Sequence, residues 1–571
     1  MILTNKKSFS DSLFKVIEEK ILHGQANEVL HLVPTNRKVR ALKKEIIDKT
    51  PAQAVSVLPI ETIFTLAEKL FSVEKSLSIA SEAASSVLLK KAFQKNQLEY
   101  FRSFSKTIPQ GSLDRIKNLF SEYKRNGITS EYLLRDLEKS DGTEKQKLSE
   151  LAKVYDSYCE LFRQLELYDI GDVIHEVNGF SLKDTAERFR KLFPSVKIIY
   201  AFGYSEFTNP EISLLKRLSE LPGINLYINL DYQSNNHGLF SSTEEVKDKF
   251  DKAGFYSFQT PVKDNENKLS DYLSHNLFNE KKIEKVNSYS PCKAGGDAVV
   301  LIAGENREDE IIQIAKEIKT LLAEKNVPPN AVCVAFHLIQ NYSGIIRDVF
   351  LQYGIPFNLT DRFSLHTFNP VISVINLLEV IATDFYHKAV FRVFSSEYYQ
   401  PVNAQSSDIF QVASKLRIIS GYQTWVTHIN YFIDEEHQTE DEILSDKKLL
   451  SLVKKEIESL YSLLKRFEEP MTLRQFSELL IQLIYDLDFP VKVLKLSKDY
   501  EEENIKSLST FIEMFSDLFE QLQLEYEQPE LQKFPLKYFL NHLKTAVAST
   551  RFNIKERPGY GVLVSNFEEI R

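Results

Sequence analysis

A short run of polar and basic side chains follows the first apolar strand signal of the chain. Thr35, Asn36, Arg37 and Lys38 come directly after the apolar run 29–33 and a proline, where a strand would end and a charged helix begin. Backbone N–H groups at a helix start, together with Arg and Lys side chains, are groups that bind phosphate. The same pattern is also typical of an ordinary helix N-cap beside solvated basic residues. Both interpretations remain open for these four residues.

The sequence contains no loop of the kind that holds nucleotide phosphates. Such a loop needs G-x-x-x-x-G-K-[ST], so that backbone amides surround the phosphates and the lysine reaches the terminal ones. The chain has 18 glycines, and none is followed by lysine. The dinucleotide pattern G-x-G-x-x-G is also missing, because Gly559 and Gly561 do not open a helix after a strand. We expect no catalytic residues and no bound cofactor; an ATPase with a non-standard site is a weak alternative.

Cysteine and histidine spacing argues against a metal site. Cys159, Cys292 and Cys333 lie far apart in the sequence, which excludes a disulfide framework, a zinc ribbon and a cysteine-ligated cluster within the chain. The 11 histidines form no H-x-H or H-x-x-x-H pair. We therefore expect no metal ligands.

Length and composition are those of ordinary globular material. The chain has 571 residues, 43% of them hydrophobic and 26% charged, with a formal net charge of -9. This length suggests roughly three to four domains, and the charge excludes a uniformly basic nucleic-acid coat while allowing a local basic groove. No apolar run is long enough to span a bilayer, and the N-terminus lacks the apolar region of a signal peptide. We expect a cytoplasmic protein.

Strand and helix signals alternate along much of the chain. This order predicts an α/β fold with parallel sheets and large all-α stretches. The alternation of apolar and polar residues over 224–231 suggests a sheet edge, and no strand is expected between 76 and 169. The expected strands are 29–33, 55–58, 196–202, 224–231, 298–303, 332–336 and 559–565. The expected helices include 37–48, 60–71, 83–93, 113–124, 145–165, 210–221, 308–325 and 342–353.

Several stretches of the first half resemble superfamily 1 helicases of the UvrD/RecB type. Residues 33–40 (VPTNRKVR) resemble helicase motif Ia, where a strand end with Thr-Asn and basic residues meets single-stranded DNA. Residues 123–129 (YKRNGIT) resemble the K-N-x-G-I-T stretch of the first helical insertion, and residues 167–174 (LYDIGDVI) resemble the segment that returns to the first core.

The segment 202–211 (FGYSEFTNPE) is the most specific part of the resemblance. The matching strand end of active helicases carries an Asp that holds magnesium and a Glu that orients water. Gly203 and Tyr204 stand at those positions, which implies a degenerate nucleotide site near Gly203, Tyr204 and Glu206. A strand followed by this pattern is similar to the B subunits of AddAB/RexAB helicase–nucleases.

The second half continues the resemblance. Residues 306–311 resemble the opening of helicase domain 2A, and residues 353–357 (YGIPF) resemble the segment after motif IV. Residues 561–571 resemble the start of motif V in the form found in AddB-like chains. In motif IV the nucleotide-contacting arginines are replaced by Leu338 and Gly344. The terminal strand also leads us to expect that the second core is incomplete.

The resemblance implies two RecA-like (P-loop NTPase-like) doubly wound cores, each with a large all-α insertion. Core 1A is expected at 1–75 and, with a linker, at 190–295, and core 2A at 296–370. The insertions 1B and 2B are expected at 76–189 and 371–548, and the truncated return strand at 549–571.

The resemblance also implies a function. The chain would be an inactive helicase-like part that guides single-stranded DNA during double-strand-break repair and recombination, beside an AddA/RexA-like helicase–nuclease. ATP and magnesium would bind that partner, and a nuclease metal and an iron–sulfur cluster would belong only to a further C-terminal region. The alternative is a protein-interaction scaffold without DNA contact, which would lack salt-sensitive DNA binding.

Two further groups of polar residues have ordinary structural interpretations. Glu206 and Asn209 are expected to cap the helix at Pro210 rather than face the nucleotide cleft. Arg188, Arg190, Lys191 and Lys197 are interpreted as a solvated basic face.

Overall fold

The structure is a computed structural model of the 571-residue chain. It describes residues 1–6, 13–50, 55, 57–105, 108–136, 142–234, 236–259, 277–278, 300–360, 362–434, 442–496, 501–524, 526, 528–553 and 561–567. The expected mixed α/β fold with parallel sheets is confirmed, and the chain is rich in helices. Within the described part, no helix is both long and apolar enough to cross a membrane.

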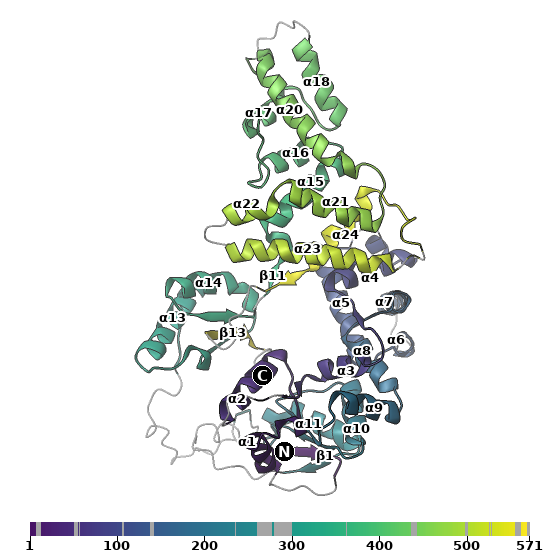
Figure 1. The fold of residues 1–571 in the computed structure, drawn as a ribbon, viewed down its shortest axis with the longest axis vertical. Helices are drawn as coiled ribbons and strands as arrows, with labels where there is room; N and C mark the ends of the chain where they lie inside the picture. The colour runs from purple at the N-terminus through teal and green to yellow at the C-terminus, as the bar shows by residue number, and fades with distance from the viewer. Residues whose placement is uncertain are drawn as a thin grey trace.

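The larger sheet has six strands in the order β3-β2-β6-β7-β1-β8. Strands β3, β2, β6 and β7 run parallel, whereas β1 is antiparallel to both β7 and β8. The strand bounds are β1 Ile2–Thr4, β2 Val29–Leu32, β3 Ile60–Glu61, β6 Ile198–Phe202, β7 Asn225–Asn229 and β8 Tyr256–Phe258. Figure 1 shows this sheet and its helices at one end of the long axis.

Helices cover both faces of the larger sheet, which explains why β2 and β6 are almost continuously apolar. Leu13 and Ile17 of α1 pack on one face, and Val39 and Ile46 of α2 pack beside them. The other face carries α3 and α8 to α11. The helix bounds are α1 Leu13–Leu22, α2 Asn36–Lys49, α3 Ile63–Ser72, α8 Ile170–Gly179, α9 Leu182–Leu192, α10 Asn209–Ser219 and α11 His237–Lys252.

The smaller sheet has three parallel strands in the order β10-β13-β9. The strand nearest the end of the sequence, β13, is therefore its central strand. Helices α13 and α14 share a hydrophobic cluster with it. The bounds are β9 Cys333–Phe336, β10 Phe357–Leu359, β13 Val562–Asn566, α13 Arg307–Ala323 and α14 Ser343–Gln352.

The remaining helices come from two separate stretches of sequence that share one hydrophobic core. Gln521 of α23 ties them together, since its side-chain amide donates to the carbonyl oxygen of Ile79 at 3.1 Å. The first stretch holds β4 Ser78–Ile79, α4 Glu82–Lys95, α5 Gln110–Arg125, α6 Ser130–Asp136, α7 Gly142–Gln164 and β5 Leu167–Tyr168. The second holds β11 Phe363–Ser364, α15 Asn369–Ala382, α16 His387–Phe394, α17 Ser406–Lys415, α18 Tyr422–Asp434, α19 Glu442–Ser445, α20 Lys447–Leu464, α21 Leu473–Asp486, α22 Phe489–Leu496, α23 Glu501–Gln523, α24 Leu536–Ser549 and β12 Arg551–Phe552.

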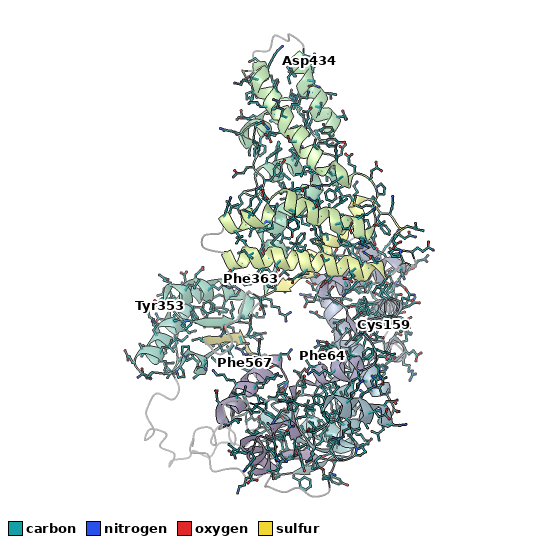
Figure 2. The ribbon with its side chains drawn as sticks, viewed as in Figure 1. Phe64, Cys159, Tyr353, Phe363, Asp434 and Phe567 are labelled. Carbon is teal, nitrogen blue, oxygen red and sulfur yellow. The ribbon has the colours of Figure 1, made fainter. Side chains whose placement is uncertain are left out.

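A cation–aromatic contact joins the smaller sheet to this helical region. The Arg347 guanidinium of α14 lies 3.5 Å from the centre of the Phe363 ring of β11. Figure 2 labels Phe363 at this junction, between the smaller sheet and the helices above it.

One expected strand is misplaced, and another is found where it was expected but lies inside the sheet. The strand predicted at 55–58 lies instead at Ile60–Glu61, because pairing of Ile60 with His31 sets its position; residues 51–54 and 56 lie outside the described part. The strand predicted at 224–231 is not an edge strand. Strand β1, too short to be identified from its own sequence, pairs along its outer side.

Two further expectations are wrong. Among the described residues of the strand predicted at 298–303, 300–303 have no strand partner, and Leu301 is 95% exposed; residues 298–299 lie outside the described part. An apolar run becomes a strand only when a neighbouring strand supplies its hydrogen bonds. Conversely, the region without expected strands contains the short parallel pair β4 and β5.

Candidate nucleic-acid interface at the edge of the larger sheet

The two sites predicted from the sequence lie next to each other. Parallel strands β2 and β6 pair Leu32 with Ala201, so their carboxyl ends meet at one edge of the sheet. Gly203 follows β6 with a φ of +78°, and a Cβ added there would lie 3.7 Å from Cδ of Pro34. The turn after β2 and the turn after β6 therefore form one continuous edge.

Thr35 is the N-cap of helix α2. Its backbone is extended, with φ -138° and ψ 149°, and its side-chain oxygen accepts a hydrogen bond from the backbone N–H of Lys38 at 3.2 Å. The ordinary capping role is thus observed, and it leaves the backbone N–H groups of Asn36 and Arg37 at the helix start without intrahelical partners. Asn36 is exposed, and Arg37 and Lys38 are half-buried. Thr35 therefore positions this helix start.

Arg37 connects the two sheets electrostatically. Burial raises the pKa of the Cys333 thiol, and the positive charge of Arg37 opposes that shift. Cys333 belongs to β9, one of the two edge strands of the smaller sheet. In Figure 1, α2 lies on the side of the larger sheet that faces the smaller sheet.

Tyr204 fills the space beside the turn after β6. Its ring stacks on Phe207 with centroids 4.7 Å apart, and burial raises the pKa of its hydroxyl. Glu206 is exposed. Within the part of the chain that the structure describes, no group of three or more His, Cys, Asp or Glu residues is arranged to hold a metal ion.

Helix α10 is capped by a residue that the sequence analysis did not choose. Thr208 is the N-cap: its N–H donates to a side-chain oxygen of Glu211 at 2.8 Å, and its hydroxyl accepts from the N–H of Glu211 at 3.4 Å. Burial raises the pKa of Glu211. The expected cap by Glu206 or Asn209 is wrong, because a cap requires an extended residue immediately before the helix, and Asn209 is already helical.

The first strand points away from this edge. Because β1 is antiparallel to β7, its carboxyl end lies at the opposite edge of the sheet from Gly203. Asn5 confirms the placement, since its side-chain amide donates to the carbonyl oxygen of Ser219 at 2.7 Å, at the end of the helix that precedes β7.

Part of the basic cluster of residues 188–197 is structural. The Arg188 side chain is 9% exposed, donates to the carbonyl oxygens of Leu70 and Phe71, and pairs with Glu74. Arg190 donates to the carbonyl oxygens of Val196 and Pro222, both at 2.7 Å. The prediction of a solvated face is therefore wrong for Arg188, whose guanidinium donates to buried carbonyl groups. Lys191 and Lys197 are exposed, as predicted.

The stretches 123–129 and 167–174 meet at a buried lysine. Lys124 Nζ lies 2.7 Å from Asp172 Oδ2 and 3.5 Å from Asp169 Oδ2, above the ring of Phe162. Only 4% of the Lys124 side chain is exposed. This ion pair holds the C-terminal end of α5 against the start of α8.

The sequence analysis missed two cations close to these elements. Lys117 of α5 and Arg551 of β12 line a pocket of about 410 Å³. Polar residues recur every three or four positions along α5, which places them on one side of the helix. This spacing is the one sequence signal that indicates a polar helix face here.

The comparisons with known proteins agree on one family. Residues 6–266 match the family model described as ADDB, N-terminal, and residues 266–552 match the UvrD-like helicase C-terminal domain. A Clostridium botulinum (strain Hall) protein, named as the B subunit of an ATP-dependent helicase/deoxyribonuclease, is 23% identical over 97% of this chain. Proteins with the same name from Thermoanaerobacter sp. (strain X514) and Anoxybacillus flavithermus are 23% and 24% identical over 85% and 84% of the chain.

The chain spans about half the length of the curated relatives it matches, 49% of the Clostridium protein and 43% of the other two. The two family models adjoin at residue 266 and together extend from residue 6 to residue 552. This chain therefore belongs to the family that combines an ADDB N-terminal region with a UvrD-like helicase C-terminal domain.

Proposed function

We propose that this chain is the helicase-like part of an AddB/RexB-type subunit and that it holds single-stranded DNA without hydrolysing ATP. The DNA lies across the start of α2, where phosphates meet the amides of Asn36 and Arg37 and the side chains of Arg37 and Lys38. The observation that carries the proposal is that the turn before α2, capped by Thr35, lies against the turn after β6, where a Cβ on Gly203 would be 3.7 Å from Cδ of Pro34.

In this proposal the two sheets are RecA-like cores, and the helical stretches between their strands are insertions. Strand orders with parallel neighbours and helices on both faces of the larger sheet support this division. The domain limits given in the sequence analysis are part of the proposal.

Several features support the absence of ATP hydrolysis. The sequence has no Gly-Lys pair, Gly203 and Tyr204 occupy the positions of the magnesium-binding and water-orienting carboxylates, and β1 ends at the opposite sheet edge. In this proposal ATP and magnesium bind to an AddA/RexA-like partner. That partner moves the DNA during double-strand-break repair in the cytoplasm.

The relatives' printed name supports the assignment to a complex, since it describes one component of an ATP-dependent helicase/deoxyribonuclease. Any nuclease activity, with its metal and an iron–sulfur cluster, would belong to a further region of the protein.

The experiment is a fluorescence-anisotropy titration of the chain with labelled oligo(dT) over a range of KCl concentrations. We expect binding that weakens steeply with salt, because each phosphate contact on a single strand contributes about 0.7 to the slope of log K against log salt. The double variant Arg37→Gln/Lys38→Gln should bind at least several-fold more weakly and reduce that slope by about one.

The matched control removes two charges farther along the same helix. Lys43→Gln/Lys44→Gln changes exposed residues of α2 that lie away from the sheet edge, and it should bind as the unmodified chain does. Equal losses in both variants would mean general electrostatic attraction instead of a site. Absence of salt-sensitive binding in a folded sample would favour the alternative, an interaction scaffold that contacts only its partner protein.

A further inference from the structure

The pocket between α4, α5 and β12 is built from a continuous polar face of one helix. Asp114, Lys117, Ser121 and Arg125 lie three or four residues apart on α5 and all line it. The start of α4, the turn before α8 and Arg551 complete the wall. Its volume of about 410 Å³ lies within the range of roughly 300–1,000 Å³ typical of small-ligand sites.

The carboxylates of this pocket already have partners. Asp169 lies 3.5 Å from Lys124, Glu82 lies 3.6 Å from Arg362, and Asp114 accepts from Gln110 at 3.0 Å. The negative charges of Asp169 and Glu82 are therefore partly neutralised from outside the pocket, whereas the partner of Asp114 is a neutral amide.

Two of the pocket's cations have only neutral partners. Lys117 donates to the hydroxyl of Ser86 at 3.3 Å, and Arg551 donates to the hydroxyl of Ser364. In the described ranges neither cation has a carboxylate within salt-bridge distance. Hydrogen bonds to charged oxygens are about twice as strong as neutral ones. An anionic ligand can therefore replace the two hydroxyl groups as the hydrogen-bond partner of both cations.

One end of the pocket, at Arg125, lies near the start of α10, which follows the turn after β6. The turn after α5 packs on the start of α10, where a Cβ on Gly127 would lie 3.4 Å from Cγ of Pro210. The positive charge of Arg125, the last residue of the polar face, opposes the rise of the Glu211 pKa that burial causes. Figure 1 shows α5 running from the larger sheet toward β11 and the helices above it. A strand that leaves the sheet edge can therefore follow α5 into the pocket.

We propose that this pocket binds one nucleotide of the guided single strand, an inference that rests on the proposed function. Lys117 and Arg551 bind its phosphate, and the amide of Asn118 with the carboxylate of Asp114 supplies donors and acceptors for the edge of a base. The apolar side chains of Ile79 and Ile170, which also line the pocket, contact the face of the base or sugar.

The first test compares two pairs of charge-removing variants in the anisotropy titration with oligo(dT). Lys117→Gln/Arg551→Gln should weaken binding at least fivefold and reduce the salt slope, whereas Arg115→Gln/Lys153→Gln removes the same charge from exposed positions and should leave affinity unchanged. Thermal unfolding by circular dichroism checks that both double variants fold. Equal affinity of the two pairs would overturn the pocket proposal while leaving the α2 interface intact.

The second test locates the nucleotide directly. Oligonucleotides carrying 5-iododeoxyuridine are crosslinked to the chain by light, and the attached peptides are identified by mass spectrometry. We expect crosslinks within α5 and around Ile170, and we expect Ser121→Trp, which fills the pocket without changing charge, to abolish them while crosslinks near α2 persist.

The outcomes separate the two proposals. Crosslinks confined to α2 in the unmodified chain would overturn the pocket proposal alone. Absence of any binding or crosslinking would overturn both.

Discussion

Gly171 lies against the backbone of Lys124 so closely that a Cβ added at Gly171 would be 2.5 Å from the Lys124 carbonyl carbon. This contact joins the start of α8 to the last turn of α5, directly beside the ion pair of Lys124 with Asp172. The two stretches are 47 residues apart in the sequence. Glycine is required here by close approach of two backbones, since its own φ is not in the left-handed region.

Gly171→Ala should therefore destabilise the chain. Overpacking against backbone costs about 1–3 kcal/mol, to be measured as the free energy of unfolding in urea. Gly179→Ala, in the same helix, meets no atom within 4 Å and should be neutral or slightly stabilising, because alanine favours a helix. Equal effects of the two substitutions would contradict the close approach.

Lys124→Met should cost about 3 kcal/mol, because it removes the buried cation and leaves Asp169 and Asp172 facing each other. Adding Asp169→Asn and Asp172→Asn to Lys124→Met should recover part of the loss, since no unpaired charge then remains. Chemical denaturation of the single and triple variants measures both effects. A triple variant less stable than Lys124→Met would refute the electrostatic explanation.

His31 makes stability depend on pH. It is buried in β2 against Tyr200 and Phe202, neither ring nitrogen has a hydrogen-bond partner, and burial lowers its pKa from 6.5 to about 4. Below about pH 6.5 the imidazole of the unfolded chain is protonated, whereas that of the folded chain stays neutral down to about pH 4. The free energy of unfolding therefore falls by up to about 3 kcal/mol as the pH drops through that window.

The test is the pH dependence of unfolding of His31→Leu. Between about pH 6.5 and pH 4 the variant should lose less stability than the unmodified chain, because it has no imidazole to protonate. His542, whose pKa burial lowers to about 3, serves as an internal comparison, and His31→Leu/His542→Leu should have the flattest profile. Identical profiles for all three proteins would show that carboxylates alone control acid unfolding.

Arg37→Gln should slow alkylation of Cys333. Arg37 opposes the rise of the Cys333 pKa caused by burial, so its removal raises that pKa further and decreases the thiolate, which is the reactive form. Iodoacetamide labelling in a Cys292→Ser background measures the rate, while the pKa of Cys159 is raised to about 11 by burial, which keeps that thiol unreactive. A rate unaffected by Arg37→Gln, yet changed by Lys43→Gln, would argue against an electrostatic effect of Arg37 on Cys333.

Restoring the two carboxylates should not create an ATPase. Gly203→Asp/Tyr204→Glu should destabilise the chain, because Gly203 has a φ of +78° and the Tyr204 ring packs on Phe207. No phosphate release is expected above background, since β1 still ends at the opposite edge of the sheet. ATP hydrolysis by a folded double variant would instead reveal a latent nucleotide site.

Much of the local structure follows from short-range signals. The run Pro34-Thr35-Asn36 after an apolar strand predicts a helix start near residue 36, because N-cap preference and strand hydrophobicity act within a few residues. The predicted helices 37–48, 210–221 and 308–325 agree within about two residues with the bounds of α2, α10 and α13. The position of Gly203 and Tyr204 at a strand end follows from the same kind of signal.

Other features depended on partners far away in the sequence. Pairing with β2 sets the position of the strand at Ile60–Glu61. The three residues of β1 pair with β7 and so place β7 inside the sheet. Leu301 is exposed because no neighbouring strand pairs with it in the described part. These outcomes depend on hydrogen bonds between strands, which periodicity within one segment does not encode.

The sequence by itself determined which residue types stand at the sheet edge, the absence of a P-loop and the start of α2, because these are properties of single residues and their immediate neighbours. Only the tertiary structure decided that the turn after β2 meets the turn after β6, that Lys124 is buried beside two aspartates, and that α5 and β12 line one pocket. These relationships join segments far apart in sequence, and the packing of separate elements around shared hydrophobic cores sets them.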